Sequence, residues 1–438
     1  MIVDEKPQGA WHGVVCAWSR LGWTSVWLSL PLLLGCGSES DREMGSGYSG
    51  SETGVPEEFL FAWVTDSDSA DLNFVAVIDA DRASPSYGQI LRTLPVPTEG
   101  AVRGHHTEHR MPSGGLLFAN DFGTGKSYVL DLRNPLAPAV ADSFVAAGPL
   151  TSPHSFERLP NGNVLATFQN EGPGNQAAGG LAELNTDGSV VRWGRGHVAG
   201  RHVRPYSLAI VPELRRVVTG SADMRQEGTS QEVQVWRLDD LELLATLPLP
   251  LEWGPAAEPR VLSDGRTVLL TTFGCKLLRI DGLDSTVGPT QLPTPQLVHE
   301  FEGTSCALPV VAGDLWIQAV PAIHGLVALD VSNPSEVREV SRVVLGEDDW
   351  PHWIALSPEQ DRIVVTGYAG SRHRIVIVEL DPATGAMVVD RAFGEEGAER
   401  PGISLERAEW SHGATGPGDP HGVVFSLRPE SDQTGPAG

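Results

Sequence analysis

The stretch SPHSFERLPNGNVLATFQ, residues 152–169, contains the unit from which the fold can be inferred. An apolar run opens at His154 and leads into Leu159-Pro160-Asn161-Gly162, which has the composition of a hairpin turn. A second β-prone run follows from Asn163 to Gln169. Two short strands joined by such a turn predict an antiparallel hairpin. The same order of strand, turn and strand recurs along the chain.

The residues that open these apolar runs are nearly evenly spaced. They are His106, His154, Tyr206, Glu258, Cys306 and His352, at steps of 48, 52, 52, 48 and 46 residues. A repeat of this length built from short strands is typical of a β-propeller with four strands in each blade. The 49 glycines and 33 prolines fit a chain with many turns.

The two ends of the repeat predict how the ring closes. Residues 59–95 hold several strands ahead of the first opening, and DPHGVVFS at residues 419–426 resembles an opening with no unit behind it. We therefore predict an all-β, seven-bladed β-propeller over residues 59–427, closed by the C-terminal strand Gly422 to Leu427. Pairing this strand with the blade begun at Phe59 would remove an open sheet edge.

The N-terminal region has the features of an export signal. Val26 to Gly35 is apolar but short for a membrane span, and Leu33-Leu34-Gly35-Cys36 resembles a bacterial lipobox, whose Cys becomes lipidated. An ordinary secretory signal or a membrane-anchor helix are the alternatives. We expect a lipoprotein-type signal peptide at 1–36, a flexible Gly/Ser/Glu tether at 37–58 and a disordered tail at 428–438. The protein is then exported and held on the cell envelope only through a lipid at Cys36.

The charge of the chain excludes some partners. It carries 56 acidic and 31 basic residues, a formal net charge of -25. Such a chain repels phosphate backbones and anionic lipid surfaces, so neither nucleic acid nor the membrane surface is an expected partner.

Histidines recur at the repeat openings, where the first strands of a propeller line its channel. His106, His154, His352 and His421 would converge at one channel mouth, with Glu258 and Cys306 on other blades. His106 belongs to RGHHTEHR, residues 103–110, which also supplies His105 and, as a reserve ligand, His109. Copper, zinc and iron all accept imidazole ligands, so the pattern favours a metal site. The alternative is a set of solvated or capped polar residues.

The segment SPSYGQI at 84–90, with VIDAD before it at 77–81 and LPVP after it at 94–97, resembles the selenium-binding protein / methanethiol oxidase family. The tandem His105-His106 occupies a similar place. Further similar segments follow in the same order over most of residues 59–425: 152–164, 204–206, 212–219, 235–236, 258–260, 323–325 and 330–334. The chain is identified as a distant member of this family.

The resemblance implies a β-propeller that binds copper through histidines. The tandem pair of the family corresponds to His105 and His106, and further family histidines correspond to His154 and His421. His324 matches a family histidine whose role stays open. His352 joins the set through the repeat spacing alone.

The sequence also departs from the family. No Cys-x-x-Cys follows the tandem pair, and Thr151 stands where the family has a histidine. The family cysteine associated with selenium has no counterpart, which argues against selenium binding through a thiol. Cys275 and Cys306 are either a disulfide or two small buried residues.

These observations lead to one main hypothesis and two alternatives. The first is a copper-dependent oxidase resembling methanethiol oxidase, which oxidises a small thiol or related sulfur compound with oxygen, zinc or iron not being excluded. Glu258 and His352 would move protons. The alternatives are a metal-binding lipoprotein without turnover and a protein-binding scaffold with incidental histidines. Trp350, Trp353 and Trp410 are either walls of the site or ordinary core and rim aromatics.

Overall fold

The computed structural model describes residues 56–97, 103–174, 177–225, 228–284, 292–394 and 397–428. These residues form thirty β-strands and three short 3-10 helices, with no α-helix among them. No helix in this part of the chain is long and apolar enough to cross a membrane. The predicted signal peptide, the tether up to Val55 and the tail from Pro429 lie outside the described residues.

Every paired strand lies in an antiparallel sheet. The first sheet has the order β3 (Ile90–Pro95), β2 (Phe74–Asp79), β1 (Phe59–Asp66) and β30 (Gly418–Phe425). The second runs β4 (Gly104–Thr107), β5 (Leu116–Asp121), β6 (Lys126–Asp131) and β7 (Ala139–Phe144). The third runs β12 (Val190–Arg195), β11 (Ala178–Leu184), β10 (Val164–Glu171), β9 (Leu150–Arg158) and β8 (Ala146–Ala147).

The next sheet has eight strands in two halves that share one residue pair, Ser221 with Ala256. One half contains β13 (Pro205–Val211), β14 (Arg216–Ser221), β15 (Glu232–Arg237) and β16 (Leu243–Pro248). The other contains β17 (Ala256–Val261), β18 (Val268–Thr272), β19 (Lys276–Asp281) and β20 (Thr294–Glu300). The 3-10 helices are η1 (Pro212–Leu214), η2 (Leu251–Trp253) and η3 (Pro321–Ile323).

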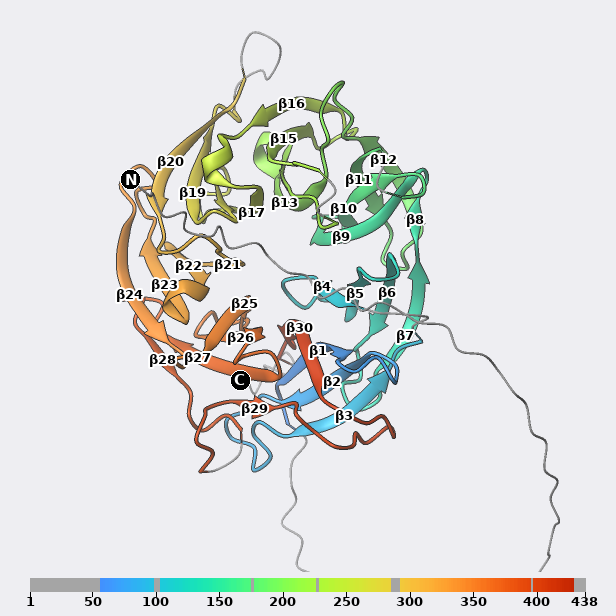
Figure 1. Cartoon of the computed structure of the whole chain (residues 1–438), viewed down its shortest axis with the longest axis vertical. Helices are drawn as coiled ribbons and strands as arrows, with labels where there is room; N and C mark the ends of the chain where they lie inside the picture. Colours follow the sequence, from blue (N-terminus) through green and yellow to red (C-terminus); the bar gives the residue numbers. More distant parts are fainter. Residues whose placement is uncertain are drawn as a thin grey trace, which may run out of the picture. The chain divides into compact units, whose positions relative to one another are not determined.

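Two sheets complete the arrangement. One runs β21 (Pro309–Ala312), β22 (Leu315–Val320), β23 (Gly325–Asp330) and β24 (Arg338–Val344). The other runs β25 (Asp349–Leu356), β26 (Arg362–Ala369), β27 (Arg374–Leu380) and β28 (Met387–Val389), with β29 (Ile403–Ser404) paired to β27. Figure 1 shows the sheets set around a ring, with β4, β9, β13, β17, β21, β25 and β30 innermost. The all-β and β-propeller predictions are confirmed.

The apolar or polar character of each strand matches how deeply the strand is buried. Strands in the middle of a sheet are covered on both faces by neighbouring sheets, and β22 (LWIQAV) is buried at all six positions. Outer strands such as β24 (REVSRVV) are largely exposed. Near-continuous apolar runs therefore mark the covered strands, and charged residues mark the rim.

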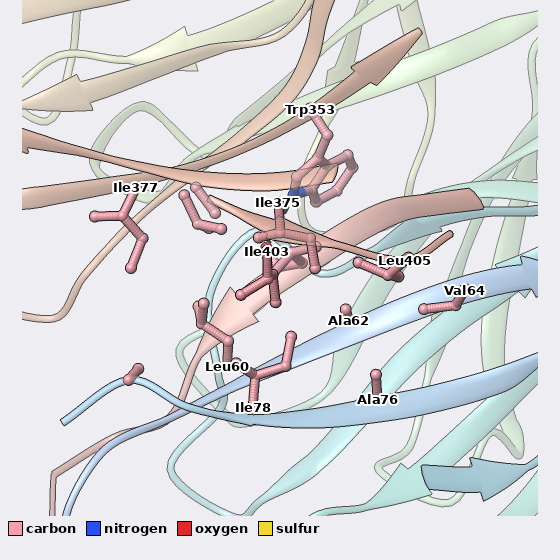
Figure 2. Packing of buried hydrophobic residues seen from close by; sticks show 14 of the residues in the cluster. Leu60, Ala62, Val64, Ala76, Ile78, Trp353, Ile375, Ile377, Ile403 and Leu405 are labelled. Carbon is pink, nitrogen blue, oxygen red and sulfur yellow. Dashed lines mark hydrogen bonds between the residues drawn. The ribbon is translucent and has the colours of Figure 1, made fainter. Parts of the chain in front are cut away.

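The hydrophobic core lies between adjacent sheets. In one cluster, Leu60 and Ala62 of β1 and Ile78 of β2 pack with Trp353 of β25 and Ile375 of β27 (Figure 2). All five are fully buried. Burying a large apolar side chain is worth about 1.5–3 kcal/mol, so this contact fixes the first sheet against the β25–β28 sheet.

The C-terminal segment forms the strand β30, which pairs with β1 from Leu60↔Phe425 to Asp66↔Gly418. Its bounds, Gly418–Phe425, are shifted toward the N-terminus relative to the predicted Gly422 to Leu427. The shift arises because the β1 register continues through Pro420 and Asp419.

The opening predicted at Cys306 differs in the structure, where Cys306 lies three residues before β21. Cys306 forms a disulfide with Cys275, and its backbone N–H donates to the Phe273 carbonyl. These bonds hold Cys306 against the β17–β20 half-sheet, so the next strand begins only at Pro309.

Candidate metal centre

A β-bulge lies at the level of the predicted openings in several inner strands. In β4 the pairing runs from Gly104↔Asp121 to Thr107↔Ala119, so two histidines oppose Asn120 alone. Similar shifts occur in β9 at residues 154–155, in β25 at residue 352 and in β30 at residues 421–422. A bulge bends the strand and redirects side chains, which brings these histidines toward one another.

His105, His106, His154 and His421 form a compact buried cluster. The ring centres of His105 and His106 are 4.2 Å apart, and that of His105 is 4.3 Å from His421. The His154 ring centre is 4.4 Å from that of His106 and 5.0 Å from that of His105. One nitrogen each of His105, His106 and His421 lie within 4.8 Å of one another. The nitrogens of His105, His106 and His421 therefore converge, and the His154 ring lies beside them without belonging to this triad.

Several imidazole nitrogens in the cluster are buried without a hydrogen-bond partner in the described structure. They are Nδ1 of His105 and Nε2 of His106, His154 and His421. Buried polar atoms are almost always paired, because leaving one unpaired costs about 1–3 kcal/mol. Free imidazole nitrogens of this kind are donors that a metal binds at about 2 Å.

Hydrogen bonds to the other nitrogens orient two of the rings. Nδ1 of His154 donates to the Tyr206 carbonyl at 2.7 Å, so its Nε2 carries a lone pair. Nδ1 of His106 lies 2.9 Å from the Ser155 hydroxyl, which can donate or accept. Such partners fix ring orientation and tautomer in metal-binding histidines.

The cluster also favours neutral imidazoles. Burial lowers the pKa of His154 to about 3. Burial, followed by the charge of neighbouring imidazoles, lowers the pKa of His105, His106 and His421 well below the usual value near 6.5. Because a metal binds the unprotonated ring, these residues are ready to act as ligands at neutral pH.

The two residues predicted to move protons occupy different surroundings. The His352 ring centre is 4.8 Å from that of His421, and its Nε2 has no described partner. Burial lowers the pKa of His352 to about 3. Glu258 is buried, and its Oε2 accepts hydrogen bonds from Ser207 at 2.7 Å and Arg260 at 2.8 Å.

Glu258 is connected to the cluster through Tyr206. Burial raises the pKa of Tyr206 well above its usual value, and the Glu258 carboxylate raises it further. The Tyr206 ring centre lies 4.2 Å from that of His154. His352 thus adjoins the cluster directly, whereas Glu258 bonds Ser207 and Arg260 and its charge acts on Tyr206.

His109, the reserve ligand, lies outside the cluster. Its ring stacks on Trp353 with centres 4.7 Å apart, and it lies 6.5 Å from the His106 ring. Its Nε2 accepts a hydrogen bond from Arg260 at 3.2 Å.

Only one of the three predicted wall tryptophans adjoins the site. Trp353 meets His106 edge-on, with ring centres 5.1 Å apart. Trp410 packs on Phe74, and Trp350 is 37% exposed.

His324 has a structural place in the fold. It follows η3 with φ at 58°, and its Nδ1 donates to the Asp349 carbonyl at 3.0 Å. Because His324 ends this helical turn and bonds a backbone carbonyl, its presence is explained without a role in metal binding.

Sequence reasoning missed Asn120, which ties the site together. Its side-chain oxygen accepts from the His106 backbone N–H at 2.7 Å. Its amide nitrogen donates to the carbonyls of Pro153 and His154 at 2.9 and 3.0 Å. The only sequence signal is an amide within the apolar run LLFAND.

Comparison with known proteins supports the fold. No protein-family model matches the chain, and no curated protein does. A solved structure titled a hypothetical selenium-binding protein from Sulfolobus tokodaii is similar with a TM-score of 0.66 and 14% identity, over 85% of this chain and 94% of that one.

Two lactonase structures are also similar. A periplasmic gluconolactonase from Pseudomonas aeruginosa has a TM-score of 0.59 and 16% identity, over 85% of this chain and all of that one. A putative 6-phosphogluconolactonase from Bacteroides fragilis has a TM-score of 0.54 and 11% identity, over 86% of this chain and all of that one. At such identities the likeness shows the fold alone. The protein is a β-propeller with a buried histidine cluster that could bind a metal.

Proposed function

We propose that this protein is a copper-dependent oxidase resembling methanethiol oxidase, which oxidises a small thiol or related sulfur compound with oxygen. The convergence of four buried imidazoles with unpartnered nitrogens carries the proposal. Copper held by His105, His106, His154 and His421 would supply one-electron redox chemistry and affinity for sulfur. Zinc and iron accept the same ligands, so the metal is part of the test.

The chain's own residues would handle protons beside the metal. His352 offers a neutral ring with a free Nε2 next to His421, where it can accept a hydrogen bond from a bound thiol and pass its proton on. Because burial lowers the pKa of His352 to about 3, it would relay such a proton rather than hold it. Glu258 would act at longer range, since its charge acts on Tyr206, whose ring lies beside that of His154. Trp353 excludes water from one side of His106.

The finer architecture belongs to the same proposal. A single residue pair joins the halves of the eight-stranded sheet, so we count them as two blades. With the remaining five sheets, this count gives seven blades. The pairing of β30 with β1 would then close the ring.

We further propose that the protein is exported and anchored by a lipid on Cys36. The lipobox-like sequence supports this, and Cys36 lies ahead of the described residues.

Metal analysis and calorimetry test the main proposal. The full-length protein, prepared without metal and titrated separately with Cu²⁺, Zn²⁺ and Fe²⁺, should bind one copper ion most tightly. His154→Ala and His421→Ala should each lower copper affinity by at least about tenfold. His373→Ala is the matched control, because His373 bonds the Gly418 carbonyl and Asp419 instead. If both site variants hold copper as the wild type does, the scaffold alternative becomes the better one.

Oxygen uptake separates turnover from binding alone. A metal-binding lipoprotein without turnover is the second candidate, and the use of cysteines favours it. Cys275 and Cys306 are joined in a disulfide, so the described part of the chain offers no thiol to the histidines. Copper-loaded protein that consumes no oxygen with methanethiol or with larger thiols would support this second candidate.

A further inference from the structure

A cavity of about 730 Å³ opens between the ends of the inner strands. Phe156 of β9, Leu208 and Ile210 of β13, Val261 of β17, Val310 of β21 and Leu356 of β25 supply much of its apolar wall. The segment that follows β4 supplies Glu108, His109 and Arg110. Contributions from so many inner strands place the cavity on the ring's central channel.

The cavity is larger than a one-carbon thiol requires. Pockets of about 300–1,000 Å³ accommodate drug-sized molecules, usually with an apolar lining and a few placed polar groups. The cavity has both features, so its size and lining point to a larger organic ligand.

Most charged groups in the wall are already paired. Arg158 makes a two-bonded ion pair with Glu108, at 2.6 and 2.9 Å. Arg260 bonds Glu258 and reaches His109. Arg110 has neither an ion pair nor a hydrogen bond with the described residues, and it is exposed at the cavity. The guanidinium of Arg110 is therefore available to a ligand.

Glu157 lies in the same wall and does not cancel this charge below pH 7. It is partly buried, and burial raises its pKa to about 7 even though Arg260 and Arg110 lower it. Glu108 and Glu258 oppose its ionisation. With Glu157 protonated, Arg110 leaves the wall with an excess positive charge inside a strongly acidic protein.

His109 is the lining residue that connects the cavity to the histidine cluster. Its ring centre lies 6.5 Å from that of His106, and the Arg260 guanidinium bonds its Nε2. A ligand held beside His109 is thus separated from the cluster by one imidazole.

We propose that this cavity binds an organic carboxylate with an extended apolar body, its charge on Arg110 and its body along the apolar wall. Binding of the carboxylate in the cavity needs no metal. The further step, that this carboxylate is the substrate oxidised at the histidine cluster, rests on the proposed function. It widens the substrate class from small thiols to anionic organic compounds.

Calorimetry with three probes of equal chain length tests the proposal on metal-free protein. Octanoate should bind at least about tenfold more tightly than 1-octanol or octylamine, because charge-assisted hydrogen bonds are the strong ones. Arg110→Gln should remove that preference. Arg92→Gln is the control, since Arg92 is exposed on β3 and its side chain bonds, among the described residues, only the neighbouring Leu91 carbonyl. Equal binding of the three probes, or octanoate affinity unchanged in Arg110→Gln, would overturn the proposal.

A pH series adds a second readout. Octanoate affinity should fall from pH 6 to pH 8 as Glu157 ionises, and Glu157→Gln should remove this fall. His109 does not titrate in this range, because burial lowers its pKa well below 6.5. A fall that persists in Glu157→Gln counts against the assignment of the wall charges. Metal content is measured separately, so a failed cavity and a failed metal site give different results.

Discussion

The imidazole rings of His105 and His106 lie parallel, with centres 4.2 Å apart and 4° between their planes, although the residues are neighbours on β4. Neighbours on a regular strand point to opposite faces. The bulge opposite Asn120 removes that constraint, so one short strand supplies two nitrogens to the cluster. The candidate metal site therefore depends on backbone irregularity as much as on residue type.

Asn120→Ala should weaken both the fold and the metal site. It leaves the His106 N–H and two carbonyls without partners in a buried place, which should lower the free energy of unfolding by about 2–4 kcal/mol. Copper affinity should fall by about tenfold or more, because the histidine positions loosen. Urea unfolding and copper calorimetry measure the two effects. Asn134→Ala, on an exposed turn, is the control. A variant that binds copper normally would show that Asn120 does not position the ligands.

Acid should destabilise the metal-free protein through the buried histidines. Their pKa values are lowered in the folded state, so below pH 6.5 the unfolded chain binds more protons and stability falls. Glu157, whose pKa is raised, acts in the opposite direction, so a difference between variants isolates the histidine effect.

The variant for that comparison is His352→Gln. We compare the free energy of unfolding of the variant with that of the wild type at each pH. This difference should favour the variant by about 1–2 kcal/mol more at pH 5 than at pH 7.5, since His352 is partly buried and its pKa is lowered to about 3. Urea midpoints at the two pH values measure this gain. Parallel pH profiles for the two proteins would contradict the buried-histidine explanation.

Removing β30 should abolish cooperative folding. A chain that stops before Gly418 leaves the β1 edge unpaired and removes the buried Val423, Val424 and Phe425. Thermal melts and limited proteolysis should show a poorly folded protein, whereas a chain that stops after Arg428 should melt like the full-length protein. If the shorter chain melts cooperatively at an unchanged temperature, β30 does not close the ring.

Changing Cys36 to Ser should release the protein into the soluble fraction, because no lipid can then be attached. Fractionation of cells that express each form measures the partition. Cys16→Ser is the control and should stay with the membranes. If Cys36→Ser partitions as the wild type does, the lipobox interpretation is wrong.

The sequence by itself determined the strand repeat and the positions of the histidines. Alternation of apolar runs with Asn-Gly and Asp-Gly turns encodes local hairpins, and an even spacing of openings implies equivalent places in a ring. His106, His154 and His421 could therefore be assigned to one site without coordinates, as could the all-β class. These features depend on local residue patterns, which a single chain displays directly.

The tertiary structure alone decided how these residues meet. The bulge at His105 and His106 depends on pairing with β5, and Asn120 is a bridge only because β9 packs beside that strand. The strand expected to begin at Cys306 begins at Pro309 instead, because Cys306 is held by its disulfide with Cys275. The cavity beside Arg110 is formed by the ends of strands up to about 250 residues apart. Such features arise from packing between distant segments, and no local pattern in the sequence specifies them.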